Sequence, residues 1–379
     1  VQILSSNLVQ NGDFSEEGTE EVSNGSFSQE GVELLSQPVN LVTDFTTNSG
    51  GVIVDADTFT TSGGGLDGIK KSFLTVGKSY KLVIEGDTTS SGFTIGSLGN
   101  SGNEYGSGFG THYFECINSG LWIRQNTSGT TNITNFSVRE VGQDWDLGTG
   151  WSIGEDKATF DETIGGAGNL NQGNILTVGK TYKLTFDTLE TNGGNLAYAF
   201  GNNSVFINNI QADTTHVVYG VADDVFLKIR GASNFNGSIT NISVKEVGQN
   251  WDLGTGFSIG EDKAFATNAS NSNLQQTNIT ISNTKKYKIN FTINDYTSGS
   301  VRPMLGAVGA VVGTFVSANG TYTEILTANN NFDRIVFRTS GTAFNGSITN
   351  ISIIEITTDT SLPRINYEGF SYQDALGSE

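Results

Sequence analysis

The feature that most constrains the fold is a long stretch of sequence that occurs twice. Residues 141–158 read VGQDWDLGTGWSIGEDKA, and residues 247–264 read VGQNWDLGTGFSIGEDKA. Trp145 in the first copy corresponds to Trp251 in the second, and a match of this length marks equivalent positions in tandem copies of one domain. Because Trp145, Trp151 and Trp251 occupy repeated positions, we expect them to lie in the domain cores.

Two other segments repeat in the same order and bring the number of copies to three. Residues 74–84 (LTVGKSYKLVI) recur as residues 176–186 (LTVGKTYKLTF) and 281–291 (ISNTKKYKINF). A closing segment rich in Ile and Val occurs at residues 131–140, 238–246 and 345–355. The apolar residues in these segments predict half-buried strands, with a bulge near Asn135 in the first closing segment.

The composition favours strands joined by turns. The chain has 49 Gly and 3 Pro, and only 16% of its residues are charged. It is rich in Thr, Ser, Asn, Phe and Ile, which suit strands and turns, and no amphipathic helical pattern of useful length occurs. A strand-like segment about every 8–12 residues is typical of a β-sandwich. We therefore predict an all-β chain of three tandem antiparallel β-sandwiches.

The sandwiches are flanked by an arm and a tail. The predicted domains are an N-terminal arm at 1–39, sandwiches at 40–143, 144–249 and 250–356, and an extended C-terminal linker or docking tail at 357–379. The arm has its own duplication, because VQNGDFSEEG from Val9 recurs as VSNGSFSQEG from Val22, each with an Asn-Gly turn signal. Phe14 and Phe27 are the expected anchors. An arm this short cannot bury its own core, so we expect it to pack on the first sandwich or on a neighbouring chain.

The charge and the scarcity of reactive residues exclude several functions. The net charge is −19 and the 20 Lys and Arg are scattered, which argues against a nucleic-acid partner. One cysteine, Cys116, and two histidines make disulfides, zinc sites and histidine catalysis unexpected. No apolar run of about 20 residues occurs, so we expect no membrane insertion. Residues 306–316 (GAVGAVVGTFV) are the most apolar stretch and predict a buried strand or hairpin.

Several segments resemble a known family. NLVQNGDFS from Asn7 resembles the opening of jelly-roll carbohydrate-binding modules. The repeated segment WDLGTG, followed by Trp or Phe, marks the junction between copies, and LTVGK follows it at residues 176–180. This combination is similar to tandem modules of phage tail-fibre and other virion surface proteins. LPRINY from Leu362 is similar to sequences that follow such modules. The resemblance covers most of residues 7–367 and implies jelly-roll-like sandwiches. Sandwich 1 departs from the family pattern. The WDLGTG segment is absent before it, and the duplicated Asn-Gly-x-Phe motif of the arm stands in its place.

The candidate site residues point to binding rather than catalysis, and we predict that the chain is not an enzyme. The Glu155-Asp156 pair cannot act as two glycosidase acids, because adjacent residues on a strand point to opposite faces. Exposed aromatic rings can stack on sugars, and the candidates are aromatics that differ between the copies, with a core position as the alternative for each: Trp122, Tyr198, Phe200 and Tyr219. The modules that this chain resembles often carry structural calcium, for which the candidates are Asp144, Asp146 and Glu155.

These observations predict a protein of the virion surface, outside the cell. The resemblance implies a phage tail fibre or receptor-binding fibre, commonly a homotrimer, in contact with other virion proteins and a host-surface glycan. Repeated sandwiches would serve as spacers and weak sugar binders that gain avidity by number. Two alternatives stay open: a capsid decoration or head-fibre protein with purely structural modules, and a bacterial surface adhesin or accessory carbohydrate-binding modules of a larger enzyme.

Overall fold

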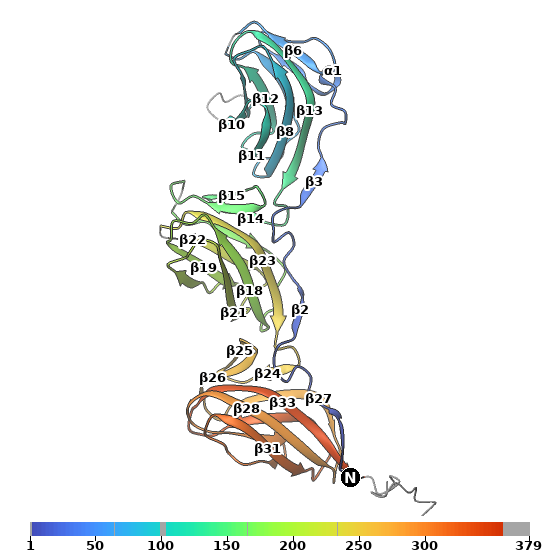
Figure 1. Ribbon diagram of the computed structural model, residues 1–379, viewed down its shortest axis with the longest axis vertical. Coiled ribbons are helices and arrows are strands. Elements are labelled where there is room, and N and C mark those ends of the chain that lie inside the picture. The colour runs from blue at the N-terminus through green and yellow to red at the C-terminus, as the bar shows by residue number, and fades with distance from the viewer. Residues whose placement is uncertain (1, 64, 99–103, 165, 233, 359–379) are drawn as a thin grey trace, which may run out of the picture. The chain divides into compact units, whose positions relative to one another are not determined.

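The computed structural model describes residues 2–63, 65–98, 104–164, 166–232 and 234–358 (Figure 1). Within these residues the only helix is α1 (Leu41–Asp44), and no helix is long and apolar enough to cross a membrane. The chain divides into two compact units. Glu20–Lys245 hold sandwiches 1 and 2, and the segments before Glu20 and after Lys245 together hold sandwich 3. The predicted tail, 357–379, lies outside the described residues from 359 onward.

Sandwich 1 consists of a five-stranded and a six-stranded sheet. Its strands are β3 (Glu30–Glu33), β4 (Thr46–Asn48), β5 (Gly51–Ile53), β6 (Thr58–Thr61), β7 (Gly68–Ser72), β8 (Ser79–Thr88), β9 (Phe93–Ser97), β10 (Glu104–Ser107), β11 (Gly110–Glu115), β12 (Gly120–Gln125) and β13 (Gly129–Val141). The five-stranded order is β10-β9-β12-β7-β4, and the other sheet is β11-β8-β13-β6-β5 with β3 paired to β13.

Sandwich 2 repeats this topology. Its strands are β2 (Glu17–Glu20), β14 (Asp146–Leu147), β15 (Trp151–Gly154), β16 (Lys157–Phe160), β17 (Asn169–Gln172), β18 (Thr181–Leu189), β19 (Asn195–Phe200), β20 (Val205–Asn208), β21 (Thr214–Val221), β22 (Leu227–Ala232) and β23 (Gly237–Val247). The two orders are β20-β19-β22-β17-β14 and β21-β18-β23-β16-β15, with β2 paired to β23.

Sandwich 3 repeats it again. Its strands are β1 (Gln2–Asn7), β24 (Trp251–Leu253), β25 (Phe257–Gly260), β26 (Lys263–Ala269), β27 (Asn273–Ile281), β28 (Lys286–Ser298), β29 (Val301–Leu305), β30 (Val311–Val312), β31 (Gly320–Thr327), β32 (Phe332–Thr339) and β33 (Phe344–Thr358). The orders are β30-β29-β32-β27-β24 and β31-β28-β33-β26-β25, with β1 paired to β33. The prediction of three tandem antiparallel sandwiches is confirmed.

Each core forms between the inner faces of the two sheets. In β8 the buried Tyr80, Leu82 and Ile84 alternate with more exposed residues, as a strand with one solvated face requires. The fully buried Ile95 and Ile123 of the five-stranded sheet belong to the same cluster. The three signature tryptophans are also buried, as expected from their repetition: Trp145, Trp151 and Trp251.

The arm supplies one strand to each sandwich, in reverse order along the chain. β1 pairs with β33 of sandwich 3, β2 with β23 of sandwich 2, and β3 with β13 of sandwich 1. Figure 1 shows β2 beside β23 and β3 beside β13. The arm therefore does not pack on sandwich 1 alone, contrary to expectation. The reason lies in the closing strands: in β33, β26 pairs only with residues up to Ile348, so the edge from Ile354 onward is free for β1.

Two local predictions meet different outcomes. The bulge in the first closing strand is confirmed, because the β8–β13 register shifts between Ile133 and Asn135. For residues 306–316 the predicted hairpin is present, because β30 pairs antiparallel with β29, but the predicted burial is wrong. Only Val311–Val312 form a strand there, and Val308 is 94% exposed. Gly306 and Gly309 adopt positive φ, which interrupts an extended ladder.

Candidate functional sites

The arm contains three copies of an eight-residue segment that recurs every 13 residues, and we call these copies cassettes: residues 7–14, 20–27 and 33–40. Each begins with a side-chain oxygen, from Asn7, Glu20 or Glu33, that accepts one bond from the amide two residues on and one from a closing strand. The closing-strand donors are Ile353, Val244 and Val138, at 2.9, 2.7 and 2.8 Å. The last strand of each sandwich, β33, β23 or β13, thus binds its cassette by the same hydrogen bond, from a strand amide to the first side chain of the cassette.

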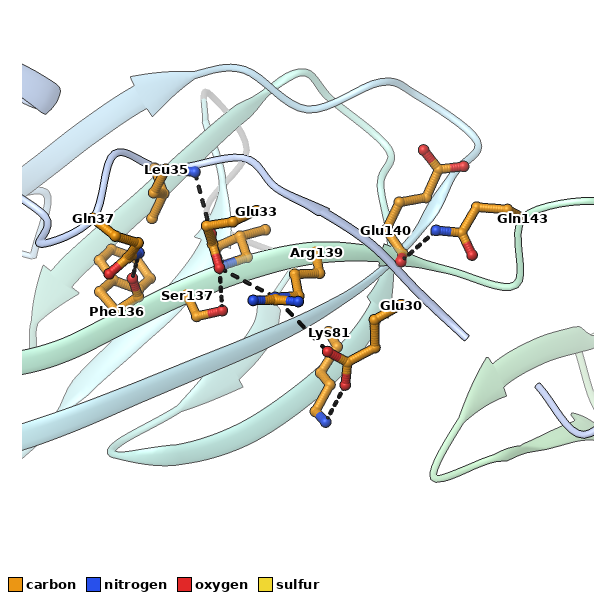
Figure 2. A network of polar contacts seen from close by, with 11 residues as sticks. Glu30, Glu33, Leu35, Gln37, Lys81, Phe136, Ser137, Arg139, Glu140 and Gln143 are labelled. Carbon is orange, nitrogen blue, oxygen red and sulfur yellow. Dashed lines mark hydrogen bonds and ion pairs between the residues drawn. The ribbon is translucent and has the colours of Figure 1, made fainter. Parts of the chain in front are cut away.

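Acidic residues of β3, the strand that leads into the third cassette, fix the arm to sandwich 1 (Figure 2). Glu33 accepts from the Ser137 hydroxyl and lies 3.4 Å from Arg139 Nε, while Glu30 pairs with Lys81 Nζ at 2.6 Å. Burial raises the pKa of Glu33, but hydrogen bonds from Ser137, two backbone amides and Arg139 outweigh burial and hold the pKa below its ordinary value. Glu33 is therefore a docking carboxylate that works in its ionised form.

The first two cassettes are anchored by their Asn-Gly-x-Phe turns. Trp251 Nε1 donates to the carbonyl of Asn11 at 3.0 Å, and Phe14 lies 5.2 Å from the Trp251 ring. The second cassette repeats both contacts, with Trp145, Asn24 and Phe27 as the partners.

A glutamine also clamps the backbone of each of these two cassettes. Gln276 donates to and accepts from Gln10, both at 2.8 Å, and Gln172 does the same with Ser23. Glycine is required in the turn, because a Cβ on Gly25 would collide with the carbonyl of Ile242.

Sandwich 1 lacks this turn and has a hollow instead. The third cassette has Gln37-Pro38 where the others have Asn-Gly, and Gln37 Nε2 donates to the Phe136 carbonyl at 2.9 Å. A hollow of about 380 Å³ is lined by Pro38, Asp57 and Thr134, among others. In sandwich 2, the equivalent threonine, Thr240, lies 3.5 Å from the turn carbonyl of Ser26. The hollow thus marks the place where the other sandwiches hold their Asn-Gly-x-Phe turn.

The outer face of each five-stranded sheet, meaning the face away from the core, carries a polar row with one arginine at an equivalent position. In sandwich 2, Asn169, Arg230, Ala197 and Phe206 are successive cross-strand neighbours. They point outward, because the flanking Leu170, Ile229 and Leu196 lie in the core. Phe206 is 50% exposed. The other two rows contain Asn48, Gly68, Arg124 and Thr94, and Asn273, Arg338 and Arg302.

Trp122 lies on the outer face of sandwich 1, next to that row. Its indole is only 4% exposed, and the Arg124 guanidinium lies 5.6 Å from its ring. Trp122 Nε1 is buried and has no acceptor among the described residues. The equivalent positions of the other sandwiches hold Lys228 and Val336. The ring and its unused donor are therefore shielded from solvent beside the Arg124 cation, and Trp122 offers no open surface on which a sugar could stack.

The other predicted aromatic ligands are not brought together with Trp122. Tyr198 and Phe200 lie in the core cluster of sandwich 2 and contact each other edge-on at 5.9 Å. Burial raises the pKa of Tyr198. Tyr219 is half-buried on β21 of the six-stranded sheet, opposite Lys183. Sequence reasoning missed Phe206 and the arginine rows. The near-constant spacing of Arg124, Arg230 and Arg338 was the available signal.

The three predicted calcium ligands lie in three different elements: a turn, a strand and a second turn. Asp144 lies in the turn after β13 with φ 78°, Asp146 lies exposed on β14, and Glu155 forms the β15–β16 turn 3.4 Å from Lys157 Nζ. Among the described residues, no group of three or more His, Cys, Asp or Glu side chains is arranged to hold a metal ion. The calcium prediction thus gains no geometric support.

Comparison with known proteins gives likeness of fold only. No family model and no curated protein matches the sequence. A fucolectin from striped bass (Morone saxatilis) serum matches at TM-score 0.21 and 10% identity, over 51% of this chain and 84% of that chain. The tandem CBM22 domain from Paenibacillus barcinonensis gives 0.23 and 9%, over 58% and 99%. The triple jelly-roll turret protein of an archaeal virus gives 0.22 and 13%, over 83% and 89%. Likenesses this distant carry no argument about function.

The fold itself defines the class: a chain of tandem jelly-roll-like β-sandwiches. The arm makes this chain a particular member of that class, because its strands β1, β2 and β3 complete the three six-stranded sheets in reverse order.

Proposed function

We propose that this chain is a non-enzymatic protein of a virion surface, similar to a phage tail fibre, whose sandwiches act as spacers and bind host-surface glycans weakly. The observation that carries the binding role is the repeated arginine row on the outer faces of the five-stranded sheets. In sandwich 2 that row ends at Phe206, which is 50% exposed beside the small Ala197. A flat apolar ring next to hydrogen-bond donors suits a sugar, which has an apolar face and a hydroxyl rim.

Homotrimerisation and contact with other virion proteins belong to the same proposal. The spacer role draws support from the arm, which adds a hydrogen-bonded strand to each sandwich. That same feature favours the structural alternative, a capsid decoration or head-fibre protein without a ligand. Labelling virus particles with an antibody against the chain, followed by electron microscopy, decides between tail and capsid. Labelled cells without particles would contradict both.

A glycan array probed with the full chain tests the binding role. We expect a few low-affinity hits that weaken in the variant Phe206→Ala. The matched control is Ile325→Ala, which removes a side chain of similar exposure, 57%, from the six-stranded sheet of sandwich 3. If no glycan binds, or if both variants lose binding equally, the outer faces are not the binding sites.

A further inference from the structure

Two arginines face each other on the outer face of sandwich 3. Arg302 of β29 and Arg338 of β32 are direct cross-strand partners. They point away from the core, because Val301 and Phe337 beside them are fully buried. Directly opposed residues of this kind have Cβ atoms about 5 Å apart, and like charges there destabilise a sheet. The pair therefore needs a physical reason.

Among the residues that the structure describes, no acidic side chain neutralises the two arginines. No described carboxylate lies within ion-pair distance of either guanidinium, although the chain has 39 Asp and Glu. Arg338 Nη1 donates to Asn273 Oδ1 at 3.2 Å, an uncharged acceptor. Arg302 Nε is buried without any hydrogen-bond acceptor. A buried donor left unused at a charged group is costly, so the pair carries an energetic cost that no described residue offsets.

An aromatic ring completes the site. The Arg302 guanidinium lies 4.4 Å from the centroid of Phe315, which is 41% exposed. The stacked ring orients the guanidinium and offers a partly open apolar surface beside it.

The pair is particular to sandwich 3. In sandwich 1 the row has Thr94 where sandwich 3 has Arg302, and Arg124 is neutralised by Glu104 at 2.9 Å. In sandwich 2 the same place holds Ala197. A second arginine has thus been added to one copy of a common surface.

We infer that Arg302 and Arg338 form a binding site for an anionic sugar. One carboxylate or sulfate group bridges the two guanidinium forks, and the sugar ring lies beside Phe315. Arginine suits this role, because its planar fork makes paired, charge-assisted bonds to oxyanions. The inference rests on the proposed glycan-binding function and names the ligand class of one of its faces.

Calorimetric titration of the full chain tests the inference with three glycans of equal length: a polyuronate, a sulfated dextran and a neutral dextran. We expect one or both anionic glycans to bind, more weakly as salt is added. Whichever binds identifies carboxylate or sulfate as the recognised group. Arg302→Gln and Arg338→Gln should each weaken that binding about tenfold or more. The control is Arg334→Gln, which removes the same charge from β32 at an arginine already paired with Asp333 at 2.8 Å.

Three outcomes overturn the inference: anionic glycans that bind no better than neutral dextran, an Arg334→Gln loss as large as the others, or full binding by Arg302→Gln. Neutral binding without anionic preference would leave the proposed function standing. A thermal melt with inorganic sulfate identifies the opposite case, in which the anion site exists but the protein binds no glycan. If sulfate stabilises the wild type but not Arg302→Gln while no glycan binds, the anion site stands and the glycan function fails.

The melt without added anion is a second readout. Because Arg302→Gln removes a like-charge contact, the variant should unfold at the same temperature as the wild type or higher. A large fall in Tm would show that Arg302 has a structural partner and would contradict the inference.

Discussion

At the scale of single residues, a tyrosine repeated in all three sandwiches fixes the turn before a central strand. The hydroxyls of Tyr80, Tyr182 and Tyr287 each accept the backbone amide five residues earlier, at 2.9, 2.9 and 2.8 Å. All three rings are fully buried. The repeated KxYK pattern in the sequence therefore marks a position where packing and turn geometry depend on one side chain.

Replacing one of these tyrosines by phenylalanine tests that role. We expect Tyr182→Phe to lower the free energy of unfolding by about 1 kcal/mol, because the Thr177 amide loses its acceptor. Urea unfolding measures the change. Tyr219→Phe, at a half-buried ring whose hydroxyl has no described partner, is the control. Equal losses in both variants would contradict a specific role of the Tyr182 hydroxyl.

Glu33 gives the arm a pH dependence of definite sign. Its pKa is lowered in the folded chain, so its contribution is present above the unfolded value of about 4.3 and is lost as pH falls through the folded value. We expect the protection factor of the Val138 amide, which is the exchange rate corrected for the intrinsic slowing of exchange in acid, to fall on acidification below about pH 4.3. Glu33→Gln should flatten this response.

The charge-matched control is Glu16→Gln, at an exposed carboxylate between the first two cassettes. A response that Glu16→Gln flattens to the same extent would show that the net charge of the arm, rather than docking of Glu33, sets the pH dependence.

Residue-level prediction succeeded where a position repeats and failed where a strand is apolar on both faces. Trp145 and Trp251 were placed in the cores from duplication alone. On β19 the sequence LAYAF gives no polar alternation, so Tyr198 and Phe200 could not be assigned to a face. The structure turns them inward and leaves Ala197 and Ala199 outward, and it is this small-residue floor that exposes Phe206.

At the scale of elements, the arm behaves as a set of separable donor strands. Every contact of the first cassette given above is made to sandwich 3, through Trp251, Gln276 and Ile353. Its duplicated motif was visible in the sequence. Its target was not, because pairing between residues 346 positions apart leaves no local signal. The third cassette was missed because it keeps only the 13-residue spacing and the leading acceptor.

Deleting residues 2–15 should therefore damage one sandwich only. We expect faster hydrogen exchange in β33 and β24 with little change in β13 and β23, since the other cassettes stay in place. A synthetic peptide of residues 2–15 should restore protection in trans by strand addition. A peptide with Phe14→Ala should fail, because it lacks the ring that packs on Trp251. Loss of protection throughout the chain would contradict separable cassettes.

At the scale of the whole molecule, three copies of one scaffold carry three different outer faces. Sandwich 1 has Trp122 with Arg124, sandwich 2 has Phe206 with Arg230, and sandwich 3 has the Arg302–Arg338 pair. The common topology could be predicted from repeated segments. The differences could not, because which residues share a row depends on strand register, and register is set by pairing rather than by local sequence.

Multivalency should show in binding to a glycan-coated surface. We expect Phe206→Ala combined with Arg338→Gln to lower surface affinity by more than either change does in solution with a short glycan, because linked sites gain from effective concentration. Surface plasmon resonance at low and high glycan density measures this. Equal losses at both densities would show that the sandwiches bind independently.

The reversed order of the cassettes sets a sequence of events during synthesis on the ribosome. The third cassette can find Val138 after closing a loop of 105 residues, the second must wait for Val244 at 224, and the first for Ile353 at 346. Of the three cassettes, the one translated first is thus the last to find its partner. Each cassette that docks brings the next cassette closer to its partner strand. The entropy cost of closing the longest loop is therefore divided into three smaller steps. The arm would therefore dock in the order third, second and first cassette as translation proceeds.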